Sequence, residues 1–312
     1  MRTILVLLLF SFQLTFSQQV TIPSYYQIDN ELSQELHQIL VELELDGNFD
    51  VGEDGIEQIS LAVIDLTSEQ PKLGGICYDN FIYPASVYKM YVASEILNQI
   101  SHGKLSLYDF YITKEPNTVD KTKEIETDPR PLLKNGDTVT VNYLLDLMIT
   151  RSDNSAANCL IDISQRPNID SLLHSYGWYG SEVTRKFLSR KYEDSGYDTI
   201  RGTETCALHA ADFMYKIYTN SLVNHWASQQ MKTLLGRQLD KSKLATGLPP
   251  TAMFYHKTGW FSYWTHDVGI VDDGDVKYII ACFMPLEEEL ALPKFKVLSE
   301  KVYEFISNRS EN

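Results

Sequence analysis

The sequence is short of positive charge. Its 312 residues include 27 Lys and Arg against 42 Asp and Glu, a formal net charge of −15. Proteins that bind a phosphate backbone or an anionic membrane surface do so with clustered Lys and Arg, so neither is favoured as a partner. The hydrophobic fraction of 44% and the charged fraction of 22% are ordinary for a globular protein, and they exclude a disordered or collagen-like chain.

Long apolar runs are also missing. The longest, residues 4–12, falls well short of the roughly 20 residues that a membrane-spanning helix needs. Arg2 precedes it, and Thr15 and Ser17 place small residues at −3 and −1 of a cut, which is the pattern of a secretory signal peptide. An uncleaved anchor is the alternative, disfavoured by the short run. We predict that residues 1–17 are removed and that the mature protein is periplasmic or secreted.

Metal-ligand patterns are absent from the sequence. The seven His residues include no H-x-H or H-E-x-x-H, and no His lies at zinc-ligand spacing from a Cys. No metal or organic cofactor is implied. The four Cys form no C-x-x-C and, after export, could pair in three complete ways, although buried free thiols are an equally good interpretation. They are Cys77, Cys159, Cys206 and Cys282.

Strand patterns lie near both ends of the chain. Residues 59–68 and 75–83 predict a hairpin around a turn at Gly74-Gly75, and residues 254–285 predict two or three antiparallel strands with a turn at Asp273-Gly274. Helical periodicity occupies most of the rest, while 112–138 and much of 165–203 resemble loops. The predicted helices cover 29–45, Ser86 to about 102, two segments of 139–164 flanking a break at 151–154, 169–176, 204–221, 225–239 and 292–308.

These patterns predict an α+β fold. An antiparallel sheet forms from both ends of the chain with flanking helices, and an all-helical lobe is inserted between its parts. We expect one catalytic domain, residues 18–312, without internal repeats. Its α/β lobe covers about 18–85 and 220–312, and its helical lobe about 86–219.

Ser86 and Lys89 form an S-x-x-K pattern at the start of a predicted helix. Positions i and i+3 share a helix face, so the Lys89 amine can reach the Ser86 hydroxyl. A neutral lysine can act as the base that activates a serine, and a helix N-terminus favours a developing oxyanion. The pattern alone is weak, because Ser101 and Lys104 also fit it. That second copy lies where the helix ends at Gly103 and lacks the N-terminal geometry.

A second group, Ser152, Asp153 and Asn154, occupies the predicted break between two helices. A serine there can relay a proton to a leaving group, and an asparagine can hold Lys89 or a substrate amide. Alternatively, Asp153 or Asn154 caps the following helix, and both interpretations can hold at once.

The third group, Lys257, Thr258 and Gly259, lies in a predicted strand. A cation and a hydroxyl that face a groove can bind a substrate carboxylate, and the glycine would let a ligand approach the strand edge closely. The alternative is an exposed Lys and Thr before a bulge glycine.

In this order, the S-x-x-K, S-D-N and K-T-G groups resemble the motif set of class A β-lactamases and penicillin-binding proteins. Their separations, 66 and 105 residues, suit that family. The flanking segments PASVYKMYVASEIL, TVTVNYLLDLMITRSDNSAANCLI and LPPTAMFYHKTGWFSYWTHDVGIV resemble it as well. The resemblance extends from about residue 30 to the C-terminus.

The resemblance implies a serine hydrolase that opens β-lactam rings. Ser86 would attack a β-lactam or acyl-D-Ala-like carbonyl and form an acyl-enzyme, with Lys89 as base or proton relay. Ser152 would pass the proton to the leaving nitrogen. The backbone N–H groups of Ser86 and Trp260 would form the oxyanion hole.

The resemblance also implies the residues that bind the substrate. Asn154 would orient Lys89 and the side-chain amide of the substrate. Lys257 and Thr258 would hold its carboxylate beside Gly259. The partner is thus a small molecule, and a monomer is favoured.

One expected motif is missing. Class A β-lactamases carry a water-activating Glu in an E-x-x-L-N motif. TRKF (184–187) and RGTET (201–205) resemble the two ends of its loop and place the Glu near 188–190, where this sequence reads Leu-Ser-Arg. Glu193 and Asp194 are the nearest candidates, although a solvated turn explains them better. A slow penicillin-binding or D-Ala peptidase-like enzyme is therefore the alternative. A non-catalytic binding protein is a further one, disfavoured by the intact nucleophile and base.

An aromatic run, Trp260 to Trp264, directly follows the third group. It could flank the groove and select a large acyl side chain. Alternatively, its tryptophans pack against helices that cover the sheet.

Overall fold

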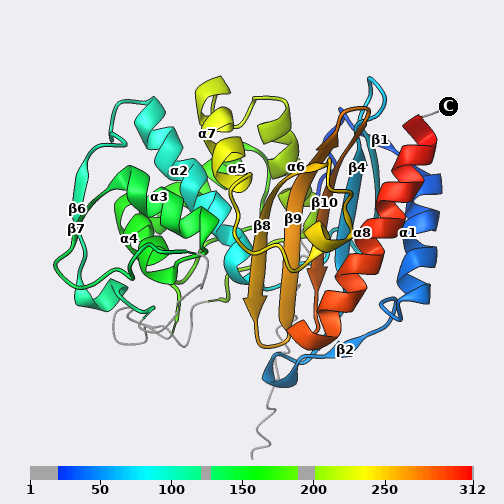
Figure 1. The fold of residues 1–312 in the computed structure, drawn as a ribbon, viewed down its shortest axis with the longest axis horizontal. Coiled ribbons are helices and arrows are strands. Elements are labelled where there is room, and N and C mark those ends of the chain that lie inside the picture. The colour runs from blue at the N-terminus through cyan, green and yellow to red at the C-terminus, as the bar shows by residue number, and fades with distance from the viewer. Residues whose placement is uncertain (1–19, 121–127, 189–200, 311–312) are drawn as a thin grey trace, which may run out of the picture.

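A six-stranded sheet stands at the centre of the protein, with helices on both faces (Figure 1). The computed structural model describes residues 20–120, 128–188 and 201–310. The strand order is β1-β5-β4-β10-β9-β8, and every neighbouring pair is antiparallel except β1 with β5. The sheet strands are β1 (Gln27–Ile28), β4 (Ser60–Asp65), β5 (Lys72–Ile76), β8 (Met253–Phe261), β9 (Trp264–Asp273) and β10 (Val276–Met284).

The helices form two groups around this sheet. In Figure 1, α1 and α8 lie along the right-hand face, and most of the others form a lobe on the left. The α-helices are α1 (Asn30–Glu42), α2 (Lys89–Ser101), α3 (Val141–Thr150), α4 (Asn154–Ser164), α5 (Arg166–Ser175), α6 (Ala207–Tyr218), α7 (His225–Leu235) and α8 (Glu288–Ser310). Short 3-10 helices are η1 (Gly52–Asp54), η2 (Ala85–Tyr88), η3 (Glu115–Asn117) and η5 (Leu244–Gly247). Two small ribbons pair β2 (Phe49–Asp50) with β3 (Ile56–Glu57), and β6 (Phe110–Ile112) with β7 (Thr138–Thr140).

Strand β4 shows why the sequence builds two cores. All six of its residues are buried, and successive side chains point to opposite faces. Leu61 and Val63 join the core beneath α1 and α8, whereas Ala62 and Ile64 join the core shared with the helical lobe. A strand that is apolar on both faces belongs in the middle of a covered sheet, and β4 lies between β5 and β10. The predicted α+β class is thus confirmed, with the sheet drawn from both ends of the chain.

The predicted first hairpin forms, but the predicted position of its turn is wrong. Gly74 and Gly75 do not form a turn but lie inside β5, paired with Val63 and Ala62. A Cβ atom on Gly74 would lie 2.5 Å from Cγ of Leu32, because α1 packs directly on the strand. The glycines therefore mark a close approach of helix and strand, which a local turn signal cannot distinguish from a turn.

Other boundaries shift for similar reasons. Ser86 lies in η2, one turn before α2, so the predicted α-helix begins at Lys89. Helix α5 begins at Arg166, three residues before the predicted start, and carries Pro in its first turn, where its missing N–H costs nothing. The turn at Gly274, with φ of 71°, is confirmed.

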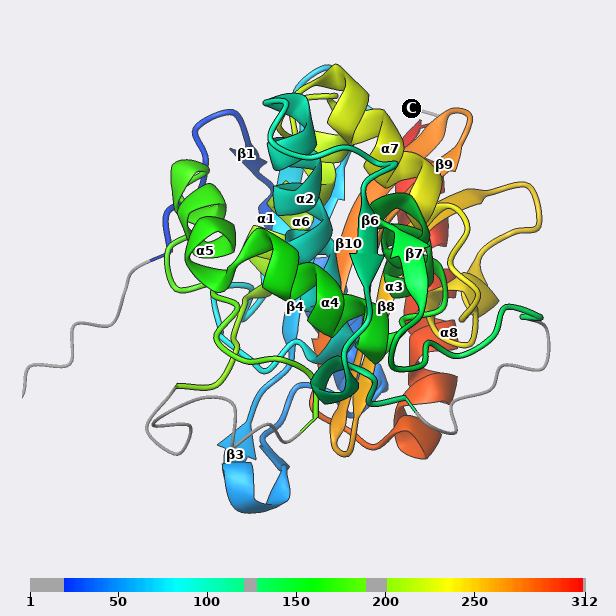
Figure 2. The ribbon, with the colours of Figure 1, turned by 90° about the vertical axis from the view of Figure 1, so that its left-hand side faces the viewer.

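The helical lobe covers the inner face of the sheet (Figure 2). Helix α6 packs against β4, β9 and β10, and α7 contacts α2, α3 and β8. The lobe boundaries near residues 86 and 219 remain predictions. Among the described residues, no helix combines the length and the apolar character that a membrane crossing requires. The predicted signal peptide lies outside the described residues.

All four cysteines are free thiols in the structure. Cys159, Cys206 and Cys282 are buried, and Cys77 is partly exposed. Burial raises the pKa of the Cys159 and Cys206 thiols to about 12, so both stay protonated and unreactive near neutral pH. Of the two interpretations left open, disulfides or free thiols, the structure agrees with free thiols.

Candidate active site

Ser86 lies in η2, where the helical lobe meets the edge of the sheet. Ala85 just before it has a φ of 45°, which turns the chain sharply between Pro84 and the helix. Helix η2 packs against β8 and β9. The serine is therefore carried by a strained turn that the two lobes hold from both sides.

Lys89 connects Ser86 to the second group of residues. Its Nζ lies 3.0 Å from Ser86 Oγ and 3.1 Å from Ser152 Oγ. It also donates to the Ser152 carbonyl oxygen and to Asn154 Oδ1, each at 2.7 Å. Lys89 has no solvent exposure. These contacts place its amine between two hydroxyl groups, as a proton relay between them requires.

The turn from 151 to 154 presents Ser152 to Lys89. Ser152 has a φ of 58°, and α4 begins two residues later. Asp153 caps that helix by accepting from the Ala156 N–H at 2.7 Å, and its other oxygen accepts from Arg151 at 2.8 Å. The capping interpretation is thus confirmed, and it fixes the turn that holds Ser152 and Asn154 beside the lysine.

Asn154 has a second partner that the sequence did not indicate. Asp120 accepts from the Asn154 backbone N–H at 2.6 Å and from its Nδ2 at 2.9 Å. The two residues are 34 positions apart, and Asp120 lies inside the polar, weakly patterned segment 112–138. No local signal in the sequence could have identified it.

Strand β8 forms the sheet side of the site. Lys257 and Thr258 are almost completely buried, and Lys257 Nζ donates to the Thr258 carbonyl oxygen at 2.8 Å. A Cβ atom on Gly259 would lie 2.8 Å from the Pro84 carbonyl oxygen and 3.2 Å from the Ser86 nitrogen. Glycine is therefore required there, because β8 passes directly beside the turn that carries Ser86.

The aromatic run after Gly259 divides between the two interpretations. Trp260 and Phe261 are 55% and 54% exposed at the end of β8. Trp264, in contrast, is buried and makes an edge contact with Tyr83. The first two are thus free to line a groove, whereas the last belongs to the core.

Phe187 is a neighbour of Lys89 that the sequence did not indicate. Its ring centroid lies 4.2 Å from Lys89 Nζ, a cation–π distance, and its ring stacks on Tyr88 at 4.5 Å. Asn158 holds its backbone on both sides, accepting from the Phe187 N–H at 2.8 Å and donating to its carbonyl oxygen at 3.3 Å. The aromatic ring is thus fixed beside the proposed base. Glu193 lies outside the described residues.

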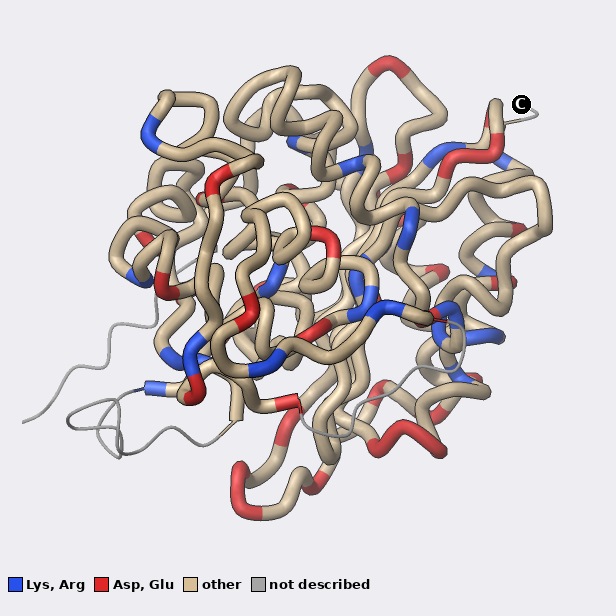
Figure 3. The backbone as a smooth tube through the Cα atoms, turned by 60° about the vertical axis from the view of Figure 1, so that its left-hand side comes forward, with Lys and Arg blue, Asp and Glu red and all other residues tan. Residues whose placement is uncertain are grey.

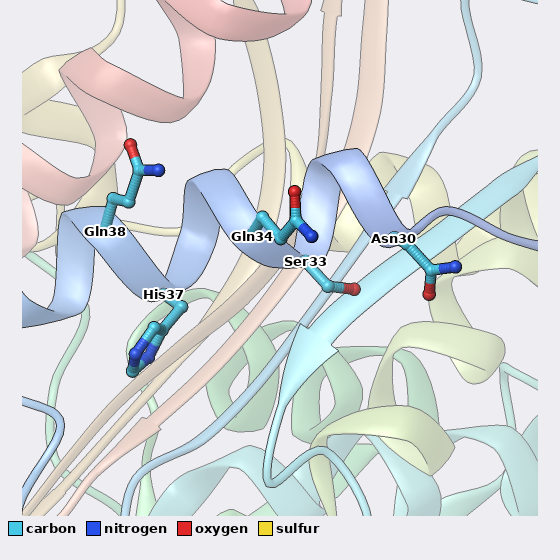
Figure 4. Close-up of a pocket in the computed structure, with 5 residues that line it drawn as sticks. All are labelled: Asn30, Ser33, Gln34, His37 and Gln38. Carbon is cyan, nitrogen blue, oxygen red and sulfur yellow. The ribbon is translucent and has the colours of Figure 1, made fainter.

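Neither a metal-binding cluster nor the hollow on α1 offers a competing centre in the described chain. No group of three or more His, Cys, Asp or Glu in the described ranges could hold a metal ion. A hollow on α1 is lined by residues of that one helix, whose labelled side chains point in different directions (Figure 4). Those residues are Asn30, Ser33, Gln34, His37 and Gln38.

Charge is also arranged around the site. Figure 3 shows acidic residues on the projecting hairpin of β2 and β3, and more of them elsewhere on the outside. Lys89 and Lys257, in contrast, are fully buried at the site. The negative net charge therefore describes the surface, whereas the site contains basic side chains.

Taken together, the side chains form a set suited to acyl transfer. A serine hydroxyl lies within hydrogen-bond reach of a lysine amine, and that amine reaches a second serine hydroxyl. Such a set can move one proton from the nucleophile to a leaving group. The fold and the site are those expected of a serine hydrolase.

Comparison with known proteins agrees with this class. Residues 49–306 match the beta-lactamase enzyme family, and the chain therefore belongs to that family. No curated protein matches the sequence.

Solved structures share the fold at low sequence identity. A mutant of PBP-A in an acyl-enzyme complex with penicillin G is 17% identical, with a TM-score of 0.73, and the match covers 90% of this chain and 98% of that one. A β-lactamase from Sphaerobacter thermophilus is 16% identical, with a TM-score of 0.73 and coverage of 88% and 98%. An ancestral class A β-lactamase is 19% identical, with a TM-score of 0.70 and coverage of 88% and 99%. The chain thus has the class A β-lactamase fold.

Proposed function

We propose that this protein is an exported serine hydrolase that opens β-lactam rings through an acyl-Ser86 intermediate and releases the product slowly. The observation that carries the proposal is the position of Lys89 Nζ, 3.0 Å from Ser86 Oγ and 3.1 Å from Ser152 Oγ. A related fold, that of the PBP-A mutant, holds penicillin G as an acyl-enzyme.

In the acylation step, the Ser86 hydroxyl proton moves to the leaving nitrogen, and a carbon–oxygen bond to Ser86 replaces the carbon–nitrogen bond of the ring. Neutral Lys89 takes the Ser86 hydroxyl proton while Oγ attacks the ring carbonyl carbon. The tetrahedral intermediate collapses as the carbon–nitrogen bond breaks. Lys89 returns the proton through Ser152 to the leaving nitrogen, so the acyl group ends on Ser86 and the ring nitrogen carries a hydrogen.

The sheet side of the site would bind the charges of the substrate. In this proposal the backbone N–H groups of Ser86 and Trp260 stabilise the oxyanion, where one such donor is worth roughly 3–4 kcal/mol. Lys257 and Thr258 hold the substrate carboxylate. The buried cation makes that position attractive to an anion despite the acidic surface.

Slow product release is supported by Phe187. Hydrolysis of the acyl-enzyme needs a water molecule and a base close to the Ser86 ester. The ring of Phe187 lies 4.2 Å from Lys89 Nζ and is 7% exposed, so an apolar surface covers that side of the amine. The second candidate is an efficient β-lactamase that uses Glu193 as its base, which the sequence of that loop allows.

The remaining features of the proposal come from the sequence. Residues 1–17 act as a cleaved signal peptide, and residues 18–312 act as one catalytic unit in the periplasm or outside the cell. We expect a monomer that needs no cofactor.

Intact-mass spectrometry with benzylpenicillin tests the proposal. The wild-type protein is expected to gain the mass of one penicillin, and Ser86→Ala is expected to abolish the gain. Ser101→Ala is the matched control, because Ser101 belongs to the second S-x-x-K copy at the end of α2. An adduct that survives Ser86→Ala, or no adduct and no hydrolysis with any β-lactam or acyl ester, contradicts the proposal.

The lifetime of the adduct separates the two candidates. An acyl-enzyme that persists for hours agrees with slow release, whereas one that clears within seconds indicates an efficient β-lactamase. In the second case Glu193→Gln is expected to lengthen the lifetime, and an unchanged lifetime would exclude Glu193 as the base.

A further inference from the structure

Asp120 holds Asn154 by two hydrogen bonds at once. Its Oδ2 accepts from the Asn154 backbone N–H at 2.6 Å, and its Oδ1 accepts from Asn154 Nδ2 at 2.9 Å. The Asn154 Oδ1 atom in turn accepts from Lys89 Nζ at 2.7 Å. A continuous chain of hydrogen bonds therefore runs from the carboxylate through the amide to the lysine beside Ser86.

Asp120 is itself held in place. It is 7% exposed, and its backbone N–H donates to Ser155 Oγ at 3.0 Å. The same hydroxyl accepts from the Val119 N–H at 2.9 Å. Helix α4, which begins at Asn154, thus fixes both the amide and the segment that carries its carboxylate partner.

The chemistry of the three groups allows one orientation of the amide. An ionised carboxylate only accepts hydrogen bonds, and a lysine amine carries N–H donors in both its neutral and its protonated form, one of which points at Asn154 Oδ1. An amide between them must therefore point its NH₂ group at Asp120 and its oxygen at Lys89. A 180° rotation of the Asn154 amide would place its oxygen against the Asp120 carboxylate and its NH₂ group against the Lys89 amine. Two acceptors would then face each other at Asp120 and two donors at Lys89, so both hydrogen bonds would be lost.

Two cations of the described helical lobe have carboxylate partners other than Asp120. Arg151 is paired with Asp153 and Asp128, and Lys186 with Asp162. Among the described residues, no Lys or Arg forms an ion pair with Asp120. Its charge-assisted hydrogen bonds within the described structure therefore go to Asn154.

We propose that Asp120 is a positioning residue for acylation. It fixes the amide of Asn154 so that Oδ1 holds the Lys89 amine at Ser86. This inference rests on the proposed function in one respect only, namely that acylation of Ser86 is the reaction measured. Asp120 touches no reacting atom, so its effect passes entirely through Asn154.

The kinetic test is a double-mutant cycle of Asp120→Asn and Asn154→Ala. The isosteric amide introduced by Asp120→Asn can donate, so the orientation of Asn154 is no longer imposed. We expect the acylation rate constant at saturating substrate to fall about tenfold to a hundredfold. In the Asn154→Ala background the same substitution is expected to have no further effect. Additive losses would indicate a general structural role and overturn the proposal.

Two substrates locate the effect. Benzylpenicillin carries a side-chain amide that Asn154 can bind, and 6-aminopenicillanic acid lacks it. Because the proposal acts through Lys89, both substrates are expected to lose rate alike. A loss confined to benzylpenicillin would assign Asp120 to substrate binding instead. Asp170→Asn is the matched control, since Asp170 also accepts a backbone N–H, that of Val183 at 2.9 Å, but lies on α5.

A crystal structure of the Asp120→Asn variant decides the question independently of catalysis. The proposal requires the 2.7 Å contact of Asn154 Oδ1 with Lys89 Nζ to lengthen beyond hydrogen-bond range or to be lost. An unchanged contact would overturn it. If the wild-type protein is not acylated, the proposed function fails, while this structural arm still tests the role of Asp120.

Discussion

Lys89 has two kinds of neighbour, and they differ in what they allow. The polar wall, defined as Ser86, Ser152 and Asn154, surrounds the amine with hydrogen-bond partners at 2.7–3.1 Å. The aromatic wall, defined as Tyr88 and Phe187, consists of two stacked rings, and the Phe187 ring lies over the amine. The first wall is equipped for moving protons, and the second presents an apolar ring face to the amine.

The difference separates two halves of one reaction. In the proposed reaction, acylation needs a base and a relay, which are Lys89 itself and Ser152 of the polar wall. Hydrolysis needs a positioned water and a base, and the aromatic wall presents the apolar ring of Phe187 to Lys89 instead. A protein can therefore retain the fold and the nucleophile of a hydrolase while only the first half is efficient. The following predictions test each wall separately.

The largest effect is expected from removing the amine that the walls share. Lys89→Met keeps the length of the side chain but leaves Ser86 without a base, so the acylation rate constant is expected to fall by about 10²–10⁴. Stopped-flow measurement with a chromogenic cephalosporin gives the rate. Lys104→Met, in the exposed second S-x-x-K copy, is the control. A change within twofold for Lys89→Met would show that Lys89 is not the base for acylation.

Converting the aromatic wall is expected to produce the next largest effect. Phe187→Glu places a carboxylate where the ring now lies, with its backbone still held by Asn158. A general base there is expected to accelerate hydrolysis of the acyl-enzyme about a hundredfold. The decay of the penicillin adduct in intact-mass spectra measures the change. Phe187→Leu, which removes the ring but adds no base, separates base catalysis from simple opening of the wall.

A smaller effect is expected at the sheet side of Ser86. Gly259→Ala would push against the Pro84 carbonyl oxygen and the Ser86 nitrogen, both within 3.2 Å of the new Cβ. The displaced turn is expected to acylate about tenfold more slowly, with adduct hydrolysis little changed. Gly47→Ala is a suitable control, because its Cβ meets no atom within 4 Å. Equal rates for the two variants would mean that β8 does not constrain Ser86.

Acid is expected to lower the stability of the protein through two buried histidines that belong to neither wall. Burial lowers the pKa of His209 to about 4 and that of His266 to about 3, from 6.5. The unfolded chain therefore binds protons that the native protein does not, and the free energy of unfolding falls as the pH drops from about 6.5 to 4. Each pKa unit contributes about 1.4 kcal/mol.

Urea unfolding at pH 7, 5.5 and 4.5 measures this loss. His209→Asn is expected to flatten the dependence, because the introduced side chain does not titrate. A midpoint that rises towards pH 4.5 would contradict the assignment. The two walls are best compared above pH 6.5, where the stabilisation is complete.

The sequence predicted what depends on short spacing. Ser86 and Lys89 are three residues apart, so local geometry alone brings them within reach. The alternation of apolar residues in 254–285 predicted two or three strands, and the structure has three, because alternation reports directly on a covered sheet. The resemblance to a known family gave the three groups, taken in their order along the chain, a functional meaning.

What the sequence did not predict depends on tertiary contacts. Asp120 reaches Asn154 across 34 residues, and Phe187 reaches Lys89 across nearly a hundred. The pair Gly74-Gly75 was misinterpreted as a turn because the neighbour that requires glycine, Leu32, lies on another element. Such contacts leave no periodic trace in one sequence.

The position of β4 has a consequence for the order of folding. This strand organises both cores, yet its partner β10 begins more than two hundred residues later. Until that part of the chain has been synthesised, one edge of an apolar strand has no partner, and such edges promote association between chains. Pairing of two strands so far apart in the sequence is also slow, because the entropy of closing the long loop is lost before the strands gain stabilising contacts. Strand β4 is therefore the part of an unfinished chain that most needs to be shielded until β10 is available.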